Sequence, residues 1–156
     1  MTTLPGDRIV VDASFLISIA EREPPAVRFV SVLKRSSISA INFGEVIYKL
    51  AQKTGVGAAA TEATFCGALS VRVDAVTLVH VRHFERLKAL DLVSRAAQTP
   101  AGVTPVKSLS LADLACLAYA SDSALPVLTG DKHWLTLNAH GLGLSIFDYR
   151  DPALTV

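Results

Sequence analysis

The sequence predicts a three-layer α/β domain with a central, mainly parallel sheet flanked by helices. Short runs of β-branched residues alternate with stretches of helical periodicity, and helical segments rather than tight hairpin turns connect these runs. Such connections are typical of parallel strands joined by crossovers. The chain has 156 residues, 51% of them hydrophobic, and a chain of this size buries roughly two thirds of its unfolded surface. No repeat or linker interrupts it, so residues 1–156 are expected to form one domain, with residues 1–7 as a short N-terminal extension.

The first half of the chain begins with a strand at residues 8–12, R-I-V-V-D, because its apolar residues are β-branched. A helix follows from Ser14 and ends before Pro24 and Pro25, since proline cannot continue a helix. Helical periodicity then resumes, with one short strand between helices. In order, the sequence predicts a helix at residues 26–35, a strand at 39–41, a helix capped by Asn42 and stopped at Gly55, and a helix at 58–69.

The second half of the chain contains the remaining strands and a helix that is apolar almost all round. The pattern predicts a strand at residues 75–81, an amphipathic helix at 83–97, a proline-flanked loop at 99–105, a helix at 111–120 and strands at 127–129 and 144–147. Ser110 is expected to cap the helix at 111–120. Because that helix lacks a continuous polar face, it is expected to be buried in the centre of the domain.

Composition and charge exclude several classes of protein. The formal net charge is +1, so overall electrostatics neither require nor exclude a nucleic-acid partner. The uncharged stretches are too short to span a bilayer, and the N-terminus lacks the basic and apolar regions of a signal peptide, so we expect a cytoplasmic protein. Cys66 and Cys116 lie far apart in apolar helical stretches, which predicts buried free thiols rather than a disulfide or a metal site.

Four acidic residues are expected to meet at the carboxyl edge of the sheet. Asp12 ends the first predicted strand, and Asp131 follows the strand that precedes the last one. Glu45 and Asp113 lie in the first turns of helices that begin at this edge. Ligands of parallel α/β sheets bind at the carboxyl ends of the strands. The sequence therefore predicts one acidic rim made from four separate segments.

Each acid also has a purely structural interpretation. Two stretches, N-F-G-E ending at Glu45 and S-L-A-D ending at Asp113, fit a capping box, in which the acid accepts a hydrogen bond from the N–H of the capping residue. Glu45 also has Lys49 one turn later as an ion-pair partner. Asp12 fits an Asx-type turn residue that caps the helix at Ser14, and Asp131 fits an N-cap of the short segment that follows it. These interpretations explain each acid singly but not their shared position.

Acids gathered at one rim need a neutralising partner. Two unit charges about 4 Å apart repel by about 4 kcal/mol at an effective dielectric constant of about 20. A site with only carboxylate and water oxygens suits Mg²⁺ or Mn²⁺, whereas zinc prefers histidine or cysteine. A metal among acids is the arrangement that activates water and shields phosphate in phosphodiester hydrolysis. The pattern therefore favours a metal-dependent hydrolase that acts on phosphodiester bonds.

The motifs that carry these acids resemble, in the same order, those of the PIN-domain nucleases. They are V-V-D-A-S-F-L with Asp12, I-N-F-G-E-V with Glu45, S-L-A-D-L-A-C-L-A-Y-A with Asp113 and L-T-G-D-K-H-W with Asp131. The resemblance covers nearly the whole chain and is greatest to the VapC toxins of bacterial toxin-antitoxin pairs. It implies a PIN-like fold and a Mg²⁺-dependent endoribonuclease, with Mn²⁺ able to substitute, in which the four acids ligate the metal directly or through water. It also implies a cognate antitoxin and a toxin homodimer.

Four further residues are candidates for supporting roles around the acids. The resemblance implies that Ser14 orients a water on the metal, although a helix N-cap is the favoured interpretation. Thr129 either forms a hydrogen bond near the metal or simply ends a strand. Lys49 and Lys53, one and two turns beyond Glu45, either hold RNA phosphates or belong to a solvated helix face.

His133 and Trp134 follow Asp131 and Lys132 in the sequence. His133 is interpreted as an exposed histidine in a short helix rather than as a metal ligand. Trp134 is interpreted as a core or interface residue.

Two other functions fit parts of the pattern. A catalytically silent PIN-like module would bind RNA or protein without cutting, and metal binding without cleavage of any RNA would indicate it. A receiver-type phosphoacceptor domain is also α/β with an acid cluster. That domain needs an adjacent pair of acids after the first strand, where V-D-A at residues 11–13 supplies only one.

Overall fold

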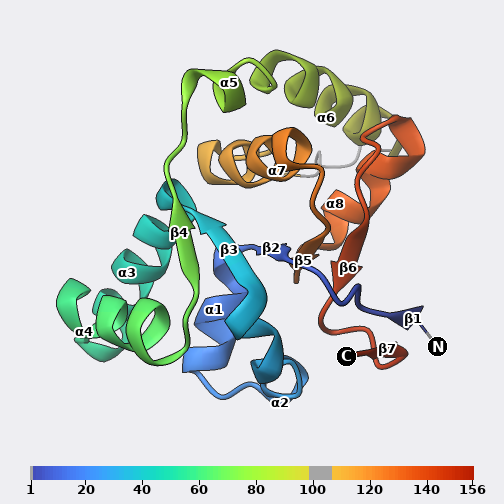
Figure 1. The fold of residues 1–156 in the computed structure, drawn as a ribbon. Helices are drawn as coiled ribbons and strands as arrows, with labels where there is room; N and C mark the ends of the chain where they lie inside the picture. Colours follow the sequence, from blue (N-terminus) through green and yellow to red (C-terminus); the bar gives the residue numbers. More distant parts are fainter. Residues whose placement is uncertain (1, 99–106) are drawn as a thin grey trace.

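The structure centres on a five-stranded parallel sheet (Figure 1). It is a computed structural model that describes residues 2–98 and 107–156. The strand order is β4-β3-β2-β5-β6, and every neighbouring pair is parallel. The strands span Ile9–Val11 (β2), Ser36–Ser39 (β3), Arg72–Asp74 (β4), Val127–Thr129 (β5) and Ile146–Asp148 (β6). The prediction of an α/β fold with a central parallel sheet flanked by helices is confirmed.

Helices cover both faces of this sheet, as Figure 1 shows. One face carries α1 (Ala13–Ala20), α2 (Pro24–Val27), the 3-10 helix η1 (Val30–Arg35), α3 (Ala40–Thr54), α4 (Ala58–Glu62) and the π-helical turn η2 (Ala63–Ala68). The other carries α5 (Leu78–Val81), α6 (Phe84–Gln98), α7 (Leu111–Ser123), α8 (Lys132–Leu137) and the 3-10 helix η3 (Asn138–His140). The sheet is therefore the middle of three layers.

The alternation of side chains along the central strand divides the core into two parts. Ile9 and Val11 pack into the cluster formed with α1 and α3, whereas Val10 between them packs against α7. All three side chains are fully buried. Successive strand residues point to opposite faces, so a strand buried on both faces is apolar at every position. Helix α7 supplies much of the second cluster, and its predicted burial is confirmed.

The N-terminal extension takes part in a second, small sheet. Thr2–Thr3 (β1) pairs in parallel with Leu154–Thr155 (β7), which brings the two ends of the chain together (Figure 1). Leu4, which follows β1, is buried in the core cluster next to α1. The sequence does not indicate this strand, because two-residue strands of this kind carry almost no periodic signal.

Two predicted boundaries in the first half are wrong. The second strand is at Ser36–Ser39 rather than at residues 39–41, and Ser39 rather than Asn42 caps the following helix by accepting the Asn42 N–H at 3.2 Å. Three serines in four residues lack the β-branched signal of a strand, yet all four residues are buried. The sequence predicts one helix at residues 26–35. The structure has two shorter helices there, α2, which starts earlier at Pro24, and the 3-10 helix η1. Proline suits the first helical turn because that turn needs no N–H donor there.

The strand predicted at residues 75–81 is also wrong. The edge strand lies just before it, at β4, where Arg72 and Asp74 form an ion pair of 2.7 Å on an exposed surface. Residues 78–81 form α5 instead, and the Thr77 N–H donates to Nδ1 of His80 at 2.9 Å. A side-chain hydrogen bond at the helix start thus outweighs the β-branched residues of this stretch.

The remaining elements agree with the sequence, with small differences. Helix α3 ends before Gly55, whose φ of 73° is the left-handed conformation that glycine adopts easily. Strand β6 begins at Ile146 rather than at residue 144, because the side chain of Asn138 bonds both the carbonyl and the N–H of Leu144.

Cys116 is buried as expected, but Cys66 is exposed, so the prediction of two buried thiols is wrong for Cys66.

Two further predictions concern membrane-spanning helices and the loop at residues 99–105. In the described residues, no helix is both long enough and apolar enough to cross a membrane. The predicted loop at 99–105 lies outside the described residues. Helices α6 and α7, on either side of it, begin and end close to their predicted positions.

Candidate functional site

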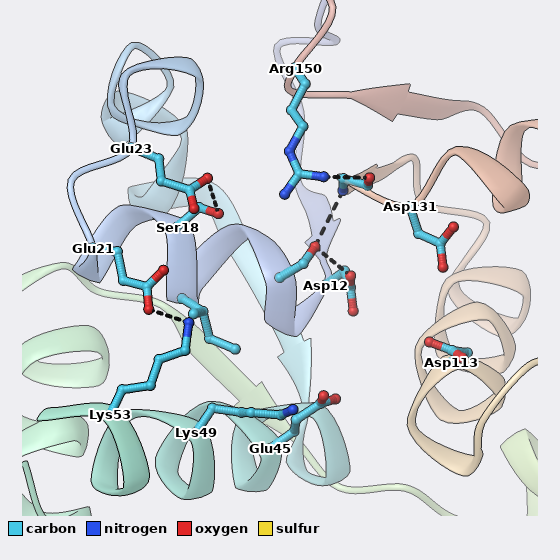
Figure 2. A pocket seen from close by; sticks show the side chains of 13 residues that line it. Asp12, Ser18, Glu21, Glu23, Glu45, Lys49, Lys53, Asp113, Asp131 and Arg150 are labelled. Atoms are coloured by element: carbon cyan, nitrogen blue, oxygen red, sulfur yellow. Dashed lines mark hydrogen bonds and ion pairs between the residues drawn. The ribbon is translucent and has the colours of Figure 1, made fainter. Parts of the chain in front are cut away.

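The four predicted acids line one pocket (Figure 2). The pocket has a volume of about 470 Å³ and lies where β2 and β5 end and where α3 and α7 begin. Its lining residues are Asp12, Ser14, Ile17, Ser18, Glu21, Glu23, Glu45, Lys49, Lys53, Asp113, Gly130, Asp131 and Arg150. One acid from each of four distant segments therefore faces a common space, as the strand ends predicted.

Asp12 is the most buried of the four acids and has the most hydrogen bonds. Its Oδ1 accepts the N–H of Ala13 at 2.7 Å, so Asp12 is the N-cap of α1. Its Oδ2 accepts the hydroxyls of Ser14 at 2.7 Å and Thr129 at 3.2 Å. The prediction that Ser14 caps this helix is wrong. Ser14 and Thr129 instead hold the Asp12 carboxylate in one orientation toward the pocket.

Burial raises the pKa of Asp12 to about 6. Loss of hydration is the main cause, because the residue is only 6% exposed, and the nearby charge of Asp113 raises the pKa further. Hydrogen bonds from Ser14, Ala13 and Thr129 lower the pKa but do not offset these effects. The ionised carboxylate of Asp12 is therefore poorly solvated in the folded protein, and a cation there would favour its ionised form.

We expect Asp12→Asn to stabilise the metal-free protein, and to do so only above about pH 4. The folded-state pKa of about 6 lies above the ordinary 3.8, so the folded protein binds more protons and loses stability as the pH rises between these values. The shift corresponds to at most about 3 kcal/mol. Urea unfolding in a chelator at pH 4 and pH 8 measures it. A gain that is equal at both pH values, or one that also occurs in the exposed control Asp7→Asn, would contradict this explanation.

Asp113 and Asp131 are each fixed at the start of a helix. Asp113 accepts the N–H of Ser110 at 2.6 Å, and Ser110 Oγ accepts the N–H of Asp113 at 3.2 Å, so the capping box is confirmed. Asp131 caps α8 by accepting the N–H of His133 at 2.8 Å, as its structural interpretation predicted. Both carboxylates keep oxygen lone pairs that no capping bond uses. Capping and pocket-lining therefore coexist in the same residues.

Glu45 has neither of its proposed structural roles. Helix α3 begins at Ala40, so Glu45 lies in its second turn, beyond the reach of a capping box with Asn42. Among the described residues, no hydrogen bond or ion pair joins Glu45 to Lys49. Figure 2 shows the Glu45 side chain directed toward the space that Asp12 and Asp113 border. Among the described residues, the Glu45 carboxylate therefore has no bonding partner and lines the pocket.

The donor chemistry of the pocket fits a hydrated divalent cation. Within residues 2–98 and 107–156, no three acidic, histidine or cysteine side chains lie close enough to form a ready-made ion site. The acids are instead distributed around the pocket, and oxygen is the only donor type they offer. Mg²⁺ usually keeps several of its waters and binds through one or two carboxylates. Separated acids around a space for water therefore suit such an ion better than a compact zinc site.

The two predicted lysines also line the pocket, with different partners. Lys53 Nζ lies 2.5 Å from Oε1 of Glu21, the residue that caps the C-terminus of α1. The two side chains form an ion pair and are both partly exposed. For Lys49, no ion pair occurs with any described residue. Of the two, Lys49 is the ammonium group that remains available to a ligand in this arrangement.

The C-terminal segment forms a wall of the pocket that the sequence did not indicate. Tyr149 is fully buried, and its hydroxyl lies 2.9 Å from Ser18 Oγ. A Cβ on Gly130 would lie only 2.7 Å from the Tyr149 hydroxyl, so this position requires glycine. Arg150 follows Tyr149 and donates from Nη1 to the Gly130 carbonyl at 3.0 Å. The glycine beside Asp131 was the one signal of this close approach, and no motif spacing pointed to Arg150.

His133 has a buried partner that the sequence did not indicate. Its Nε2 lies 2.9 Å from Oδ1 of Asp91, a residue of α6 with no exposed surface, and the His133 side chain is 9% exposed. Asp91 Oδ2 also accepts from Arg95 Nε at 3.2 Å and from the Leu109 N–H at 3.3 Å. The interpretation of His133 as an exposed histidine is therefore wrong. Asp91 connects α6 to α8, which Asp131 caps, and to the segment that enters α7.

Comparison with known proteins gives one family and several similar folds. The model of the PIN domain matches residues 9–138. No curated protein sequence matches the chain. Similar solved structures are DNA-bound VapBC from Salmonella typhimurium (18% identity, 92% of this chain and 98% of that chain, TM-score 0.62), VapBC-1 from nontypeable Haemophilus influenzae (14%, 96% and 98%, 0.58) and DNA-bound VapBC2 from Rickettsia felis (11%, 95% and 98%, 0.58). At these identities the likeness shows a shared fold.

Proposed function

Because this chain belongs to the PIN domain family, we propose that it is a metal-dependent endoribonuclease and the toxin of a toxin-antitoxin pair. The observation that supports the proposal most is the shared pocket of Asp12, Glu45, Asp113 and Asp131. These residues come from four segments and converge at the carboxyl edge of the sheet, the usual ligand site of such folds. The raised pKa of Asp12, caused mainly by burial and further by the charge of Asp113, means that a bound cation would stabilise the ionised carboxylate. A cation held by these carboxylates is what hydrolysis of RNA phosphodiester bonds would require.

Mg²⁺ is the proposed cofactor, with Mn²⁺ able to substitute, and the four acids are its proposed ligands, directly or through water. When bound, such a cation supplies a Lewis acid that activates water and offsets negative charge on the phosphate. Asp12 is prepared for this role because Ser14 and Thr129 fix its orientation. Glu45 contributes a carboxylate without a structural partner among the described residues, so it is free to accept a proton or bind a water.

The proposed partners are a cognate antitoxin, an RNA substrate and a second copy of the chain. Another solved structure of similar fold is a toxin-antitoxin complex from Klebsiella pneumoniae, which supports an antitoxin partner. RNA binding is proposed for Lys49 and Lys53, which lie on α3 and line the same pocket as the acids. The ion pair of Lys53 with Glu21 must open before that ammonium group contacts a phosphate, so Lys49 is the more direct candidate.

Chelation is expected to stop cleavage and to remove a stabilising ligand. Excess EDTA should abolish RNA cleavage, and Mg²⁺ or Mn²⁺ should restore it. A cation that binds only the folded state raises its stability by about 2.7 kcal/mol at a concentration of about 100 times its dissociation constant. Thermal unfolding with increasing Mn²⁺ measures this effect, with Asp12→Asn as the matched variant that should respond less. Unchanged cleavage in excess EDTA would contradict metal dependence.

The alternative is a catalytically silent PIN-like module. The separation of the acids, with no ready-made three-residue ion site among the described residues, is the observation that favours it. Such a module would still be stabilised by Mn²⁺ or bind RNA, but it would cut no RNA in the presence of either cation. The cleavage assay with and without EDTA therefore separates the two functions.

A further inference from the structure

We propose that Arg150 binds a backbone phosphate of the RNA at the acidic pocket, a role that rests on the proposed nuclease function. Arg150 lies two residues beyond β6, on the opposite side of the pocket from the lysines of α3 (Figure 2). Its side chain extends toward Asp12 in that view. A phosphate held there would lie beside the carboxylates.

The guanidinium of Arg150 has hydrogen-bond donors to spare. Arginine carries five N–H donors, and the only described acceptor of this side chain is the Gly130 carbonyl. Six carboxylates line the pocket, yet none of them, nor any other in the described chain, forms an ion pair with Arg150. A planar group with free parallel donors matches the geometry of phosphate oxygens.

Other arginines of the chain contrast with this arrangement. Arg28 and Arg86 donate to backbone carbonyls at two or more positions each, and Arg72 and Arg95 pair with aspartates. The donors of Arg28 and Arg86 join segments far apart in the sequence, whereas Arg72 and Arg95 each pair with an aspartate of their own strand or helix. Arg150 makes one such bond and lines the pocket, so its remaining donors are available to a ligand there.

The position of Arg150 is fixed by two buried neighbours. Its guanidinium carbon lies 5.1 Å from the centre of the Tyr149 ring, and that ring is held by Phe15 and by the hydroxyl of Ser18. The Gly130 carbonyl is equally restrained, because the Tyr149 ring packs directly against Gly130. These two contacts restrain the exposed side chain of Arg150, so less freedom is lost when a ligand binds, which favours binding.

The charge of the pocket makes a fixed cation useful at this place. Six carboxylates face three cationic side chains, of which Lys53 is already paired with Glu21. RNA brings further negative charge to the same space. A divalent cation would offset part of the repulsion at the acids, and Arg150 would offset part of it at the opposite wall, so the RNA backbone would be held from both sides.

The test compares RNA binding by arginine variants in a cleavage-deficient Asp12→Asn background. Arg150→Ala should lower the affinity for a short single-stranded RNA about ten- to a hundredfold, because a charged hydrogen bond contributes about 1.5 to 3 kcal/mol. The slope of log affinity against log salt should fall by about 0.7. Arg150→Lys should keep the slope but recover only part of the affinity, since an ammonium lacks the planar fork.

Arg82→Ala is the matched control, because it removes one exposed arginine that lines no part of the pocket. It should change neither affinity nor slope, and Mn²⁺ stabilisation should be the same in Arg150→Ala and its parent. RNA affinity and salt slope of Arg150→Ala equal to those of the control would overturn the proposal. If the wild type cuts RNA in that case, only the role of Arg150 fails. If the wild type neither binds nor cuts RNA, the nuclease function fails and the role of Arg150 falls with it.

Discussion

Asp12→Asn and Asp113→Asn are each expected to reduce RNA cleavage by about a thousandfold or more while leaving the fold intact. A bound cation contributes several kcal/mol to the stability of the transition state, and each 1.36 kcal/mol corresponds to about a factor of ten in rate. Both carboxylates border the pocket, and their charges already interact across it. The single-turnover cleavage rate at saturating Mg²⁺ measures the loss.

The fold of these variants is expected to survive because asparagine keeps an oxygen acceptor in each place. In Asp12→Asn the acceptor can still bond the Ala13 N–H, and in Asp113→Asn the Ser110 N–H. Asp122→Asn removes a partly exposed carboxylate elsewhere and serves as the activity control. Cleavage at the wild-type rate in both pocket variants would remove the acids from the mechanism. Loss of activity together with loss of cooperative unfolding would show a structural effect instead.

Asp91→Ala is expected to destabilise the protein by about 3 to 5 kcal/mol, because it leaves buried charged and polar partners unpaired. His133, Arg95 and the Leu109 N–H would all lose their acceptor. For a chain of this length the melting temperature should fall by about 6 to 20 °C. Burial acts to raise the pKa of Asp91, but hydrogen bonds from His133 and Leu109 and the charge of Arg95 hold it below its ordinary value. The stabilisation is therefore present above the ordinary carboxyl pKa and is lost as the pH falls through the lowered one.

The chain offers a matched control for this buried pair. Asp122 lies 3.6 Å from His80 and 4.0 Å from His83, and its side chain is 38% exposed. Exposed pairs of this kind contribute about 1 kcal/mol or less, so Asp122→Ala should have a small effect. Equal losses in Asp91→Ala and Asp122→Ala would mean that burial of Asp91 does not carry the energy assigned to it. Asp91→Asn, which keeps one acceptor, should lie between the two.

The parts of the fold that could be predicted from sequence are those with a strong local signal. Strand β2 is an uninterrupted β-branched run, and α7 combines the Ser110 cap with apolar residues on every side. Strand β3 could not be placed correctly because three of its four residues are serines, which are buried by the neighbouring strands β2 and β4 and by helices α3 and α7. Strand β4 is a polar edge strand beside a β-branched stretch that folds as α5. Both errors arise where sheet neighbours or capping outweigh local propensity.

The candidate site shows the same division. Three of the four acids could be predicted because Asp12 follows a strand and Asp113 and Asp131 lie at the starts of helices, so the topology determines which edge they occupy. Glu45 was predicted to open a helix but lies in the second turn of α3, and it reaches the same pocket because α3 begins at this edge. Arg150 and Asp91 could not be predicted, because their roles depend on packing between distant segments. Arg150 reaches the pocket through its contact with Gly130, 20 residues away, and Asp91 meets His133 across 42 residues. Neither separation leaves a periodic trace in the sequence.

The most direct test of RNA cleavage at Asp12, Glu45, Asp113 and Asp131 is to sequence RNA ends from cells that express the chain. Wild-type protein and Asp12→Asn would be produced at equal levels, without an antitoxin, and the new RNA ends compared. We expect ends to accumulate at recurrent positions with the wild type and to be absent with Asp12→Asn. Identical RNA ends in both samples would contradict the assignment of this pocket as a ribonuclease site.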